Sequence, residues 1–131
     1  MYILDTHALL WTLFDPDQLS SKVKKIVSDS QLDVRVSAIS FWEISLKFSL
    51  NKLILDGICP TDLPGSVKDS SLSILDLEVG HLASFHQLPR REHKDPFDRM
   101  LIWQAIQNKA TLISKDNKFP LYAEYGLKLI W

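Results

Sequence analysis

Short apolar runs alternate with longer helical stretches along this chain, and this alternation constrains the fold more than any other feature. The apolar runs are predicted strands: Met1–Leu4, Val34–Val36, Ser73–Leu75, Thr111–Ser114 and Leu127–Ile130. The stretches between them have helical spacing or helix caps: His7–Phe14 after Thr6, a second helix after Ser20 or Ser21, Ser37–Leu53, Val79–Phe85, and a helix from Asp95-Pro96 to about Asn108. Such alternation predicts an α/β fold with a central, mainly parallel sheet and helices on both faces.

The length of the chain fits one domain. Its 131 residues are enough to bury a core without disulfides. No repeat and no flexible linker divides the sequence, so we expect a single domain over residues 1–131. The segment 56–72 is rich in glycine and proline and is predicted to be a loop with one helical turn.

The composition favours a reduced, cytoplasmic protein without a membrane partner. Cys59 is the one cysteine, so no disulfide can form within the chain. The first apolar run is short and ends at Asp5, unlike a signal peptide, and no apolar stretch approaches the roughly 20 residues that span a bilayer. The net charge of −1 does not exclude a nucleic-acid partner, because carboxylates that bind cations would leave the other residues with a net positive charge.

Acidic residues follow the predicted strands or begin the predicted helices at several points. Asp5 ends the first strand, Asp116 comes just after the strand Thr111–Ser114, and Asp95 and Asp98 flank the start of a helix. The carboxyl ends of parallel strands share one edge of the sheet, where ligands bind in such folds, so we expect these side chains to meet there. Converging carboxylates repel one another unless a cation that prefers oxygen ligands, such as Mg²⁺, binds between them.

Most of these acids also have a structural interpretation that needs no metal. Asp5 and Asp95 can help to cap the helices that follow them. Asp98 can interact with the dipole of its helix, and Asp116 can form a turn. Glu43 is harder to explain in this way, because it lies inside a predicted helix at the margin of the apolar stripe, where a carboxylate needs a partner. The residues alone leave both interpretations open.

A more specific signal comes from segments spread over nearly the whole chain. They are Leu4–Trp11 (LDTHALLW), Ser37–Ser45 (SAISFWEIS), Asp95–Ile102 (DPFDRMLI) and Leu112–Asp116 (LISKD). In this order and at these separations they resemble the PIN-domain ribonucleases, and among these the VapC-type toxins of bacterial toxin–antitoxin pairs. Lys115 stands where the family often has arginine, and Asn51 where glycine is common, but neither replaces an acid.

The resemblance implies a three-layer α/β/α fold and endonucleolytic cleavage of RNA by a water activated by Mg²⁺ or Mn²⁺. It also implies a homodimer and inhibition by a cognate antitoxin protein. Asp95 is then an auxiliary residue, and Thr6 is expected to support the site through its hydroxyl group. Matched by position, the catalytic and metal-binding acids are Asp5, Glu43, Asp98 and Asp116.

Basic residues lie close to the acids in the sequence. The helix that carries Asp98 is preceded by Arg90, Arg91 and Lys94. Arg99 directly follows Asp98 within this helix. We expect these cations to bind phosphates on either side of the cleaved one, with a solvated loop as the alternative. The four histidines lack the spacing of a metal-binding or catalytic motif, so we expect no such role for them.

Aromatic residues are frequent in the first predicted helix and in the helix Ser37–Leu53. Core packing explains most of them, and a partly exposed apolar groove for an antitoxin segment or a second subunit explains the rest. The aromatic side chains are Trp11, Phe14, Phe41, Trp42 and Phe48.

Two other classes of function fit the sequence less well. A phosphatase or receiver-like domain also places an acid after its first strand, but His7 stands where such phosphatases have a second acid, and the acidic pair of a receiver is absent. A non-catalytic binding module is not supported, because all the acids that the resemblance requires are present.

Overall fold

The computed structural model describes residues 1–90 and 92–131. Strands and helices follow one another in the order β1 (Tyr2–Leu4), α1 (Thr6–Phe14), α2 (Ser21–Ser28), β2 (Val34–Ser37), α3 (Ala38–Ser49), α4 (Leu63–Lys68), β3 (Ser73–Leu75), α5 (Val79–Ser84), α6 (Pro96–Gln107), β4 (Thr111–Ile113) and β5 (Lys128–Ile130). Short 3-10 helices are η1 (Pro16–Gln18), η2 (Pro60–Asp62), η3 (Phe85–Gln87) and η4 (Phe119–Tyr125). No helix in these described ranges is long and apolar enough to cross a membrane.

The strands form one sheet in the order β3-β2-β1-β4-β5, and each neighbouring pair is parallel. Leu4 is in register with Val36 on one side and with Ile113 on the other, so β1, β2 and β4 end at the same edge. The chain builds outward from β1 to β3 and then crosses back to place β4 on the other side of β1. The ends of β1 and β4 therefore form the topological switch point, where open α/β sheets bind their ligands.

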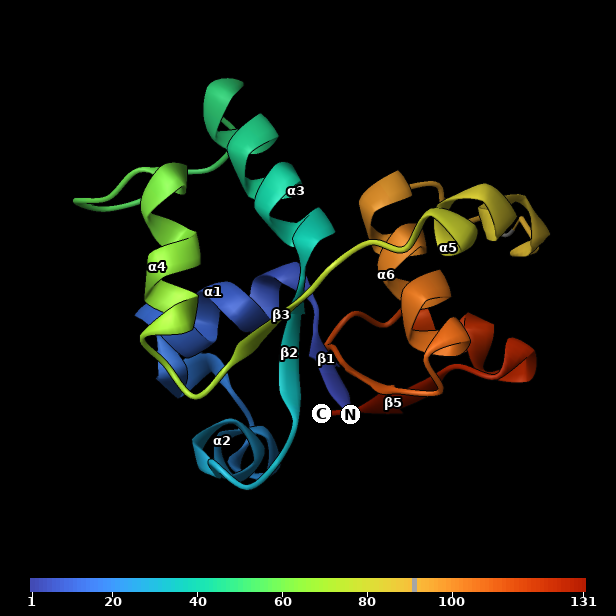
Figure 1. Ribbon diagram of the computed structural model, residues 1–131, viewed down its shortest axis with the longest axis horizontal. Helices are drawn as coiled ribbons and strands as arrows, with labels where there is room; N and C mark the ends of the chain where they lie inside the picture. Colours follow the sequence, from blue (N-terminus) through green and yellow to red (C-terminus); the bar gives the residue numbers. More distant parts are fainter. Residues whose placement is uncertain (91) are drawn as a thin grey trace.

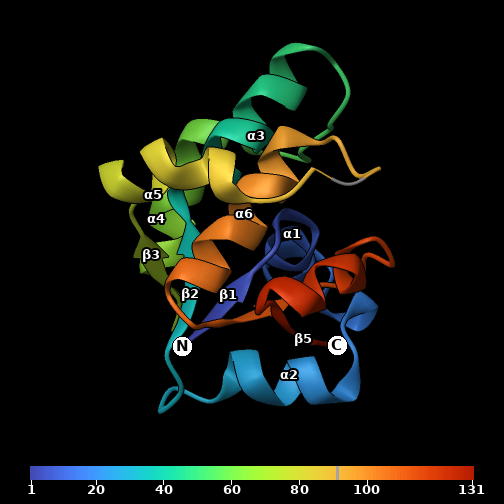
Figure 2. The same cartoon turned by 90° about the vertical axis from the view of Figure 1, so that its right-hand side faces the viewer.

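Helices cover both faces of the sheet and make three layers, as the sequence predicts. In Figure 1, α1, α2 and α4 lie on one side of the sheet, and α5 and α6 lie on the other. Successive residues of β1 point to opposite faces: Ile3 packs in a core with Leu101 of α6, whereas Leu4 packs in a second core with Leu9 of α1 and Val67 of α4. Figure 2 shows α3 at the end of the molecule opposite to α2.

Several element boundaries differ from the predicted ones. Asp5, and not Thr6, is the N-cap of α1, because the Asp5 carboxylate accepts a hydrogen bond from the backbone N–H of Ala8. The third helix begins after its N-cap Ser37 and ends at Ser49, four residues earlier than predicted. Its apolar stripe continues past this end, but the chain turns away at Asn51, which has a left-handed φ of 57°.

Two segments are more ordered than their composition predicts. The glycine- and proline-rich segment contains η2 and all of α4, because Leu63 and Val67, one helical turn apart, are buried in the second core. The segment after β4 forms η4, which was not predicted from the sequence, and buries Phe119 and Tyr122 in the first core. In both cases contacts with the rest of the fold outweigh local propensity.

Candidate functional site

Asp5 stands at the switch point, at the junction of β1 and α1. Its carboxylate accepts the capping hydrogen bond from Ala8 at 2.7 Å, and the residue is 5% exposed. Burial raises the pKa of the Asp5 carboxyl group, the charge of Asp116 raises it further, and hydrogen bonds from Ser114 and Ala8 lower it. The net shift is upward, so the ionised form of Asp5 is disfavoured unless a cation approaches.

Glu43 is held beside Asp5 by the neighbouring Thr6. The Thr6 hydroxyl donates to Glu43 Oε1 at 2.6 Å and lies 3.0 Å from the hydroxyl of Ser40. The other carboxylate oxygen of Glu43 accepts from Lys47, one turn later on α3. Glu43 is 3% exposed, so these contacts supply the partners that a buried carboxylate needs.

The amino group of Lys47 interacts with acids from two different parts of the chain. Burial lowers the pKa of its amino group, but the hydrogen bond and charge of Glu43 and the charges of Asp95 and Asp98 raise it, and the net shift is upward. The Lys47 ammonium group on α3 therefore lies close enough to interact with the charges of Asp95 and Asp98 at the start of α6.

Asp98 lies in the first turn of α6, and its backbone N–H donates to the N-cap residue Asp95 at 3.0 Å. The pKa of the Asp98 carboxyl group is raised to about 6, mainly by burial and also by the charges of Asp95 and Glu43, while a hydrogen bond with His93 opposes this rise. That bond joins His93 Nε2 to Asp98 Oδ2 over 3.0 Å.

His93 is buried, as are Asp5 and Glu43. The residue is 6% exposed, and its ring lies 5.5 Å from the ring of Phe119 and 6.1 Å from that of Tyr122, both in η4. Packing against these aromatic rings fixes the plane of the imidazole, so the Nε2 atom is aimed at Asp98.

Asp116 completes the set from the loop after β4. Its backbone N–H donates to the Ser114 hydroxyl at 3.1 Å, and its Oδ1 atom accepts from the backbone N–H of Lys118 at 2.8 Å, so the residue does form a turn. It also approaches α6: one ligand atom each from His93, Asp98 and Asp116 lie within 4.8 Å of one another. The structural and the metal-binding interpretations of Asp116 are therefore compatible.

The structure thus brings the acids together at one edge of the sheet. Asp5 interacts electrostatically with Asp116, and Asp98 with Glu43. This donor set fits a divalent cation, because like charges are crowded in a partly buried space and the pKa values of Asp5 and Asp98 are raised in consequence. Carboxylate oxygens are the ligands that Mg²⁺ and Mn²⁺ prefer in proteins.

Two side chains at this site were not predicted from the sequence. Lys47 follows Glu43 by four residues, a spacing that brings two helical side chains together and can be recognised in the sequence. His93 has no comparable signal, because its contact with Asp98 depends on the loop before α6 and on η4, neither of which has a regular pattern.

The predicted RNA-binding residues lie in different surroundings. Arg90 and Lys94 are exposed, and Arg91 lies outside the described residues. Arg99 is turned toward the preceding loop: its guanidinium donates to the carbonyls of Leu88 and Pro89 and lies 5.0 Å from the centre of the Phe85 ring. The structure therefore gives Arg99 a role in holding this loop.

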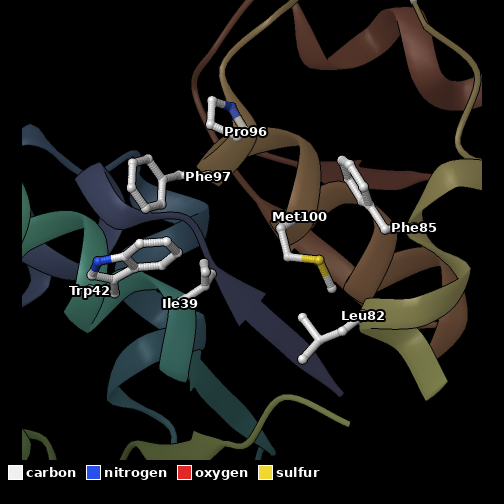
Figure 3. Close-up of a pocket in the computed structure, with 7 residues that line it drawn as sticks. All are labelled: Ile39, Trp42, Leu82, Phe85, Pro96, Phe97 and Met100. Atoms are coloured by element: carbon white, nitrogen blue, oxygen red, sulfur yellow. The ribbon is translucent and has the colours of Figure 1, made fainter. Parts of the chain in front are cut away.

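An apolar pocket of about 230 Å³ lies near the acids, between α3, α5 and α6 (Figure 3). Trp42 and Phe97 make an edge contact with each other on one side of it, with ring centres 5.2 Å apart and an interplanar angle of 79° (Figure 3). Trp42 precedes Glu43 and Phe97 precedes Asp98, so the acids and the pocket share the same two helices. Trp42 is 61% exposed, which is unusual for so large an apolar side chain.

Comparison with known proteins places these observations in a wider context. A family model described as PIN domain matches residues 2–125. No curated protein gives a significant match to the sequence.

Two solved structures have a similar fold at low sequence identity. One chain, from the crystal structure of VapBC2 from Rickettsia felis bound to a DNA fragment from their promoter, is 18% identical with a TM-score of 0.70. Another, from DNA-bound VapBC of Salmonella typhimurium, is 14% identical with a TM-score of 0.66. Each alignment covers 98% of this chain and 96% of the other, so the whole fold is shared.

Proposed function

The chain belongs to the PIN domain family, a family of nucleases, and from this premise we propose that it is a metal-dependent endoribonuclease. The observation that carries the proposal is the approach of His93, Asp98 and Asp116 to within 4.8 Å, with Asp5 and Glu43 in electrostatic contact with them. The choice of RNA as substrate rests on the resemblance of the sequence motifs to the PIN-domain ribonucleases.

We propose that the catalytic and metal-binding residues are Asp5, Glu43, Asp98 and Asp116, with Mg²⁺ or Mn²⁺ as the cation. When bound, such a cation supplies positive charge to a phosphate oxygen and lowers the pKa of a water molecule. Asp95 acts as an auxiliary residue, because its carboxylate caps α6 and adds negative charge beside Asp98.

The other polar residues of the site position these acids. Thr6 and Lys47 hold one oxygen each of the Glu43 carboxylate, so this side chain cannot rotate freely. His93 holds one oxygen of Asp98. Because these hydrogen bonds hold the carboxylates of Glu43 and Asp98 before a substrate binds, the side chains of the site need little rearrangement when the phosphodiester binds.

We propose that Arg90, Arg91 and Lys94 bind phosphates that flank the cleaved one. Arg90 and Lys94 are exposed on the loop before α6, which carries Asp98, and this placement supports the proposal. Arg99, whose guanidinium donates to the carbonyls of Leu88 and Pro89, is a weaker candidate.

We further propose that the chain is a toxin that a cognate antitoxin inhibits, that it forms a homodimer, and that it acts in the cytoplasm. The two similar structures come from VapBC complexes, which supports an antitoxin partner. The pocket of Figure 3 offers an antitoxin segment an apolar anchor beside the acids. Light scattering of the purified chain, alone and with antitoxin, tests the homodimer.

The decisive experiment measures cleavage of RNA by the purified chain in Mg²⁺ or Mn²⁺, with mapping of the new ends. Asp98→Asn and Asp5→Asn are the test variants, because asparagine keeps the shape of each side chain and caps a helix as well as aspartate does. We expect each variant to lose about 100-fold or more in rate and to keep the circular dichroism of the wild type. Cleavage by either variant at the wild-type rate would contradict the proposal.

A further inference from the structure

A second pocket adjoins the proposed catalytic acids on the side of α1 and the loop after β4. We call it the Trp11 pocket and define it by His7, Trp11, Lys115 and Lys118 together with the acids Asp5 and Asp116. Its volume is about 510 Å³, which falls in the range of small-molecule sites in proteins. A single nucleotide is therefore of a suitable size for it.

Trp11 is the largest side chain of this pocket, and its ring is held in place by its neighbours. His7 lies one turn earlier on α1, with its ring centre 5.7 Å from that of Trp11 at an angle of 40°. Trp131 makes an edge contact with Trp11 at 5.8 Å and 61°. Neither contact is a parallel stack. The two rings therefore orient the indole but do not lie flat against its face, where a stacked base would lie.

The rest of the pocket carries charge of both signs. The Lys115 ammonium lies 6.0 Å from the centre of the Trp11 ring, which is the limit of a cation–π attraction, and is therefore held weakly there. Lys118 is exposed on the same loop. An aromatic platform beside cations that are free to meet phosphates is the usual arrangement for binding single-stranded nucleic acid.

We propose that the Trp11 pocket binds one unpaired nucleobase of the substrate, stacked on Trp11, while Lys115 and Lys118 contact the adjoining phosphates. This inference rests on the proposed ribonuclease function and specifies its substrate: RNA in which a base next to the cleaved phosphodiester is unstacked. Duplex RNA keeps its bases stacked and paired, so it cannot fill the pocket. Asp5 and Asp116 line the same pocket, so a base bound there places its own phosphate close to the acids.

A structural role for Trp11 does not account for these features as well. The residue does pack against the second core, and this contact explains why it is half-buried. Core packing alone does not require two lysines and a histidine to line the space in front of the indole.

The test measures binding of a short, fluorescently labelled single-stranded RNA in Ca²⁺, in which binding is expected to be separable from cleavage. Trp11→Leu removes the platform, Trp11→Phe keeps a smaller one, and Phe14→Leu is the matched control on the same helix, outside the pocket. We expect Trp11→Leu to weaken binding by about 5- to 150-fold, the factor that corresponds to about 1–3 kcal/mol for one stacked base. Trp11→Phe should retain part of the affinity, and Phe14→Leu all of it.

A second series changes the RNA and keeps the wild-type chain, so it does not depend on the folding of a variant. One base at a time is replaced by an abasic site along the oligonucleotide. We expect a loss of affinity at one position or at two adjacent positions, and no further loss there in Trp11→Leu. Equal affinity across the series, or equal affinity of Trp11→Leu and wild type, would overturn the proposal.

Three outcomes separate this proposal from its alternatives. If Trp11→Leu loses affinity for the antitoxin and keeps its affinity for RNA, the pocket is a protein-binding surface and the proposal is wrong. If the wild type cleaves RNA but the abasic series is flat, the ribonuclease function stands and the base pocket does not. If the abasic series shows a bound base and no RNA is cleaved in Mg²⁺ or Mn²⁺, the pocket stands and the proposed chemistry fails.

Discussion

At the residue scale, no sequence pattern marks His93 as a residue of the site, yet its ring is held in place by several contacts in the structure. Its Nε2 atom is 3.0 Å from Asp98 Oδ2, and its ring packs on Phe119 and Tyr122. A hydrogen bond of this kind fixes which way a metal-binding carboxylate points, and removal of such a partner costs about 10–100-fold in metal affinity. We therefore regard His93 as a positioning residue for Asp98.

His93→Leu should lower the affinity for Mn²⁺ by about 10–100-fold. Leucine suits the apolar contacts of the ring, so the fold should persist, whereas the carboxylate of Asp98 loses its partner. His93→Gln, which can still donate a hydrogen bond to Asp98, should recover most of the affinity. Calorimetric titration with Mn²⁺ measures the effect independently of cleavage, and unchanged affinity in a folded His93→Leu chain would refute the positioning role.

The raised pKa of Asp98 predicts a dependence of stability on pH. Burial and the charge of Asp95 raise this pKa to about 6, against about 3.9 in an unfolded chain. The folded state then binds a proton at Asp98 more tightly than the unfolded chain does. The resulting stabilisation of the fold is complete below about pH 4 and is lost as the pH rises through about 6. By the usual conversion the loss is about 3 kcal/mol in the absence of metal.

Urea unfolding in EDTA at several pH values tests this prediction, with Asp98→Asn as the reference. The free energy of unfolding of the wild type should fall relative to that of Asp98→Asn as the pH rises from about 4 to about 7. Addition of Mg²⁺ or Mn²⁺ at neutral pH should restore stability to the wild type and not to the variant. A constant difference between the two chains across this range would show that Asp98 is not perturbed.

At the level of single residues, the sequence predicted that the acids meet and that Thr6 supports them, but it did not predict the contacts of His93 and Lys47. Asp5 and Asp116 follow strands, and Asp98 begins a helix, so the rule that ligands bind at the carboxyl edge was enough to group them. The contact of His93 with Asp98 and the orientation of Arg99 depend on an irregular loop. No periodic pattern determines the course of such a loop, so these contacts required the structure.

At the scale of the elements, α6 shows how one carboxylate serves both the fold and the site. Asp95 caps the helix by accepting from the backbone N–H of Asp98, and its charge also raises the pKa of the Asp98 carboxyl group. The capping and the electrostatic effect can be separated by substitution, because asparagine caps a helix as well as aspartate does but carries no charge.

Asp95→Asn should therefore keep the free energy of unfolding close to that of the wild type at neutral pH, while Asp95→Ala loses about 1 kcal/mol. Both variants should lower the pKa of Asp98, because both remove the neighbouring charge. Urea unfolding measures the first effect, and carboxyl carbon shifts in an NMR titration measure the second. Equal destabilisation by asparagine and alanine would mean that Asp95 does not act as a cap.

The order and type of the main elements could be predicted from the sequence, because each strand is a short apolar run between helices. The errors lie where local signals compete. Asp5 and Thr6 are both good caps, and the structure selects the one that follows β1 directly. The apolar stripe of α3 extends past its end at Ser49, because Leu53 packs on the second core from outside the helix.

At the scale of the whole molecule, the parallel sheet collects residues that are far apart in the chain. The junction after β1, the loop after β4 and the helices α3 and α6 each supply one acid, and the switch between β1 and β4 places them at one edge. The helices α3 and α6 also leave Trp42 and Phe97 on the surface beside these acids. A partner that fills this apolar pocket therefore lies where it can block the proposed catalytic acids.

This arrangement predicts that inhibition and catalysis can be separated in the intact chain. Trp42→Ala should keep RNA cleavage and the fold, because the side chain is 61% exposed and holds no acid in place. It should weaken inhibition by the antitoxin by about 30-fold, the factor that corresponds to about 2 kcal/mol for an aromatic side chain at the centre of an interface. Ile54→Ala is the matched control, since Ile54 is 88% exposed and lies outside the pocket. Titration of the antitoxin against cleavage measures both variants; equal inhibition of Trp42→Ala and wild type would show that the antitoxin blocks the acids from another surface.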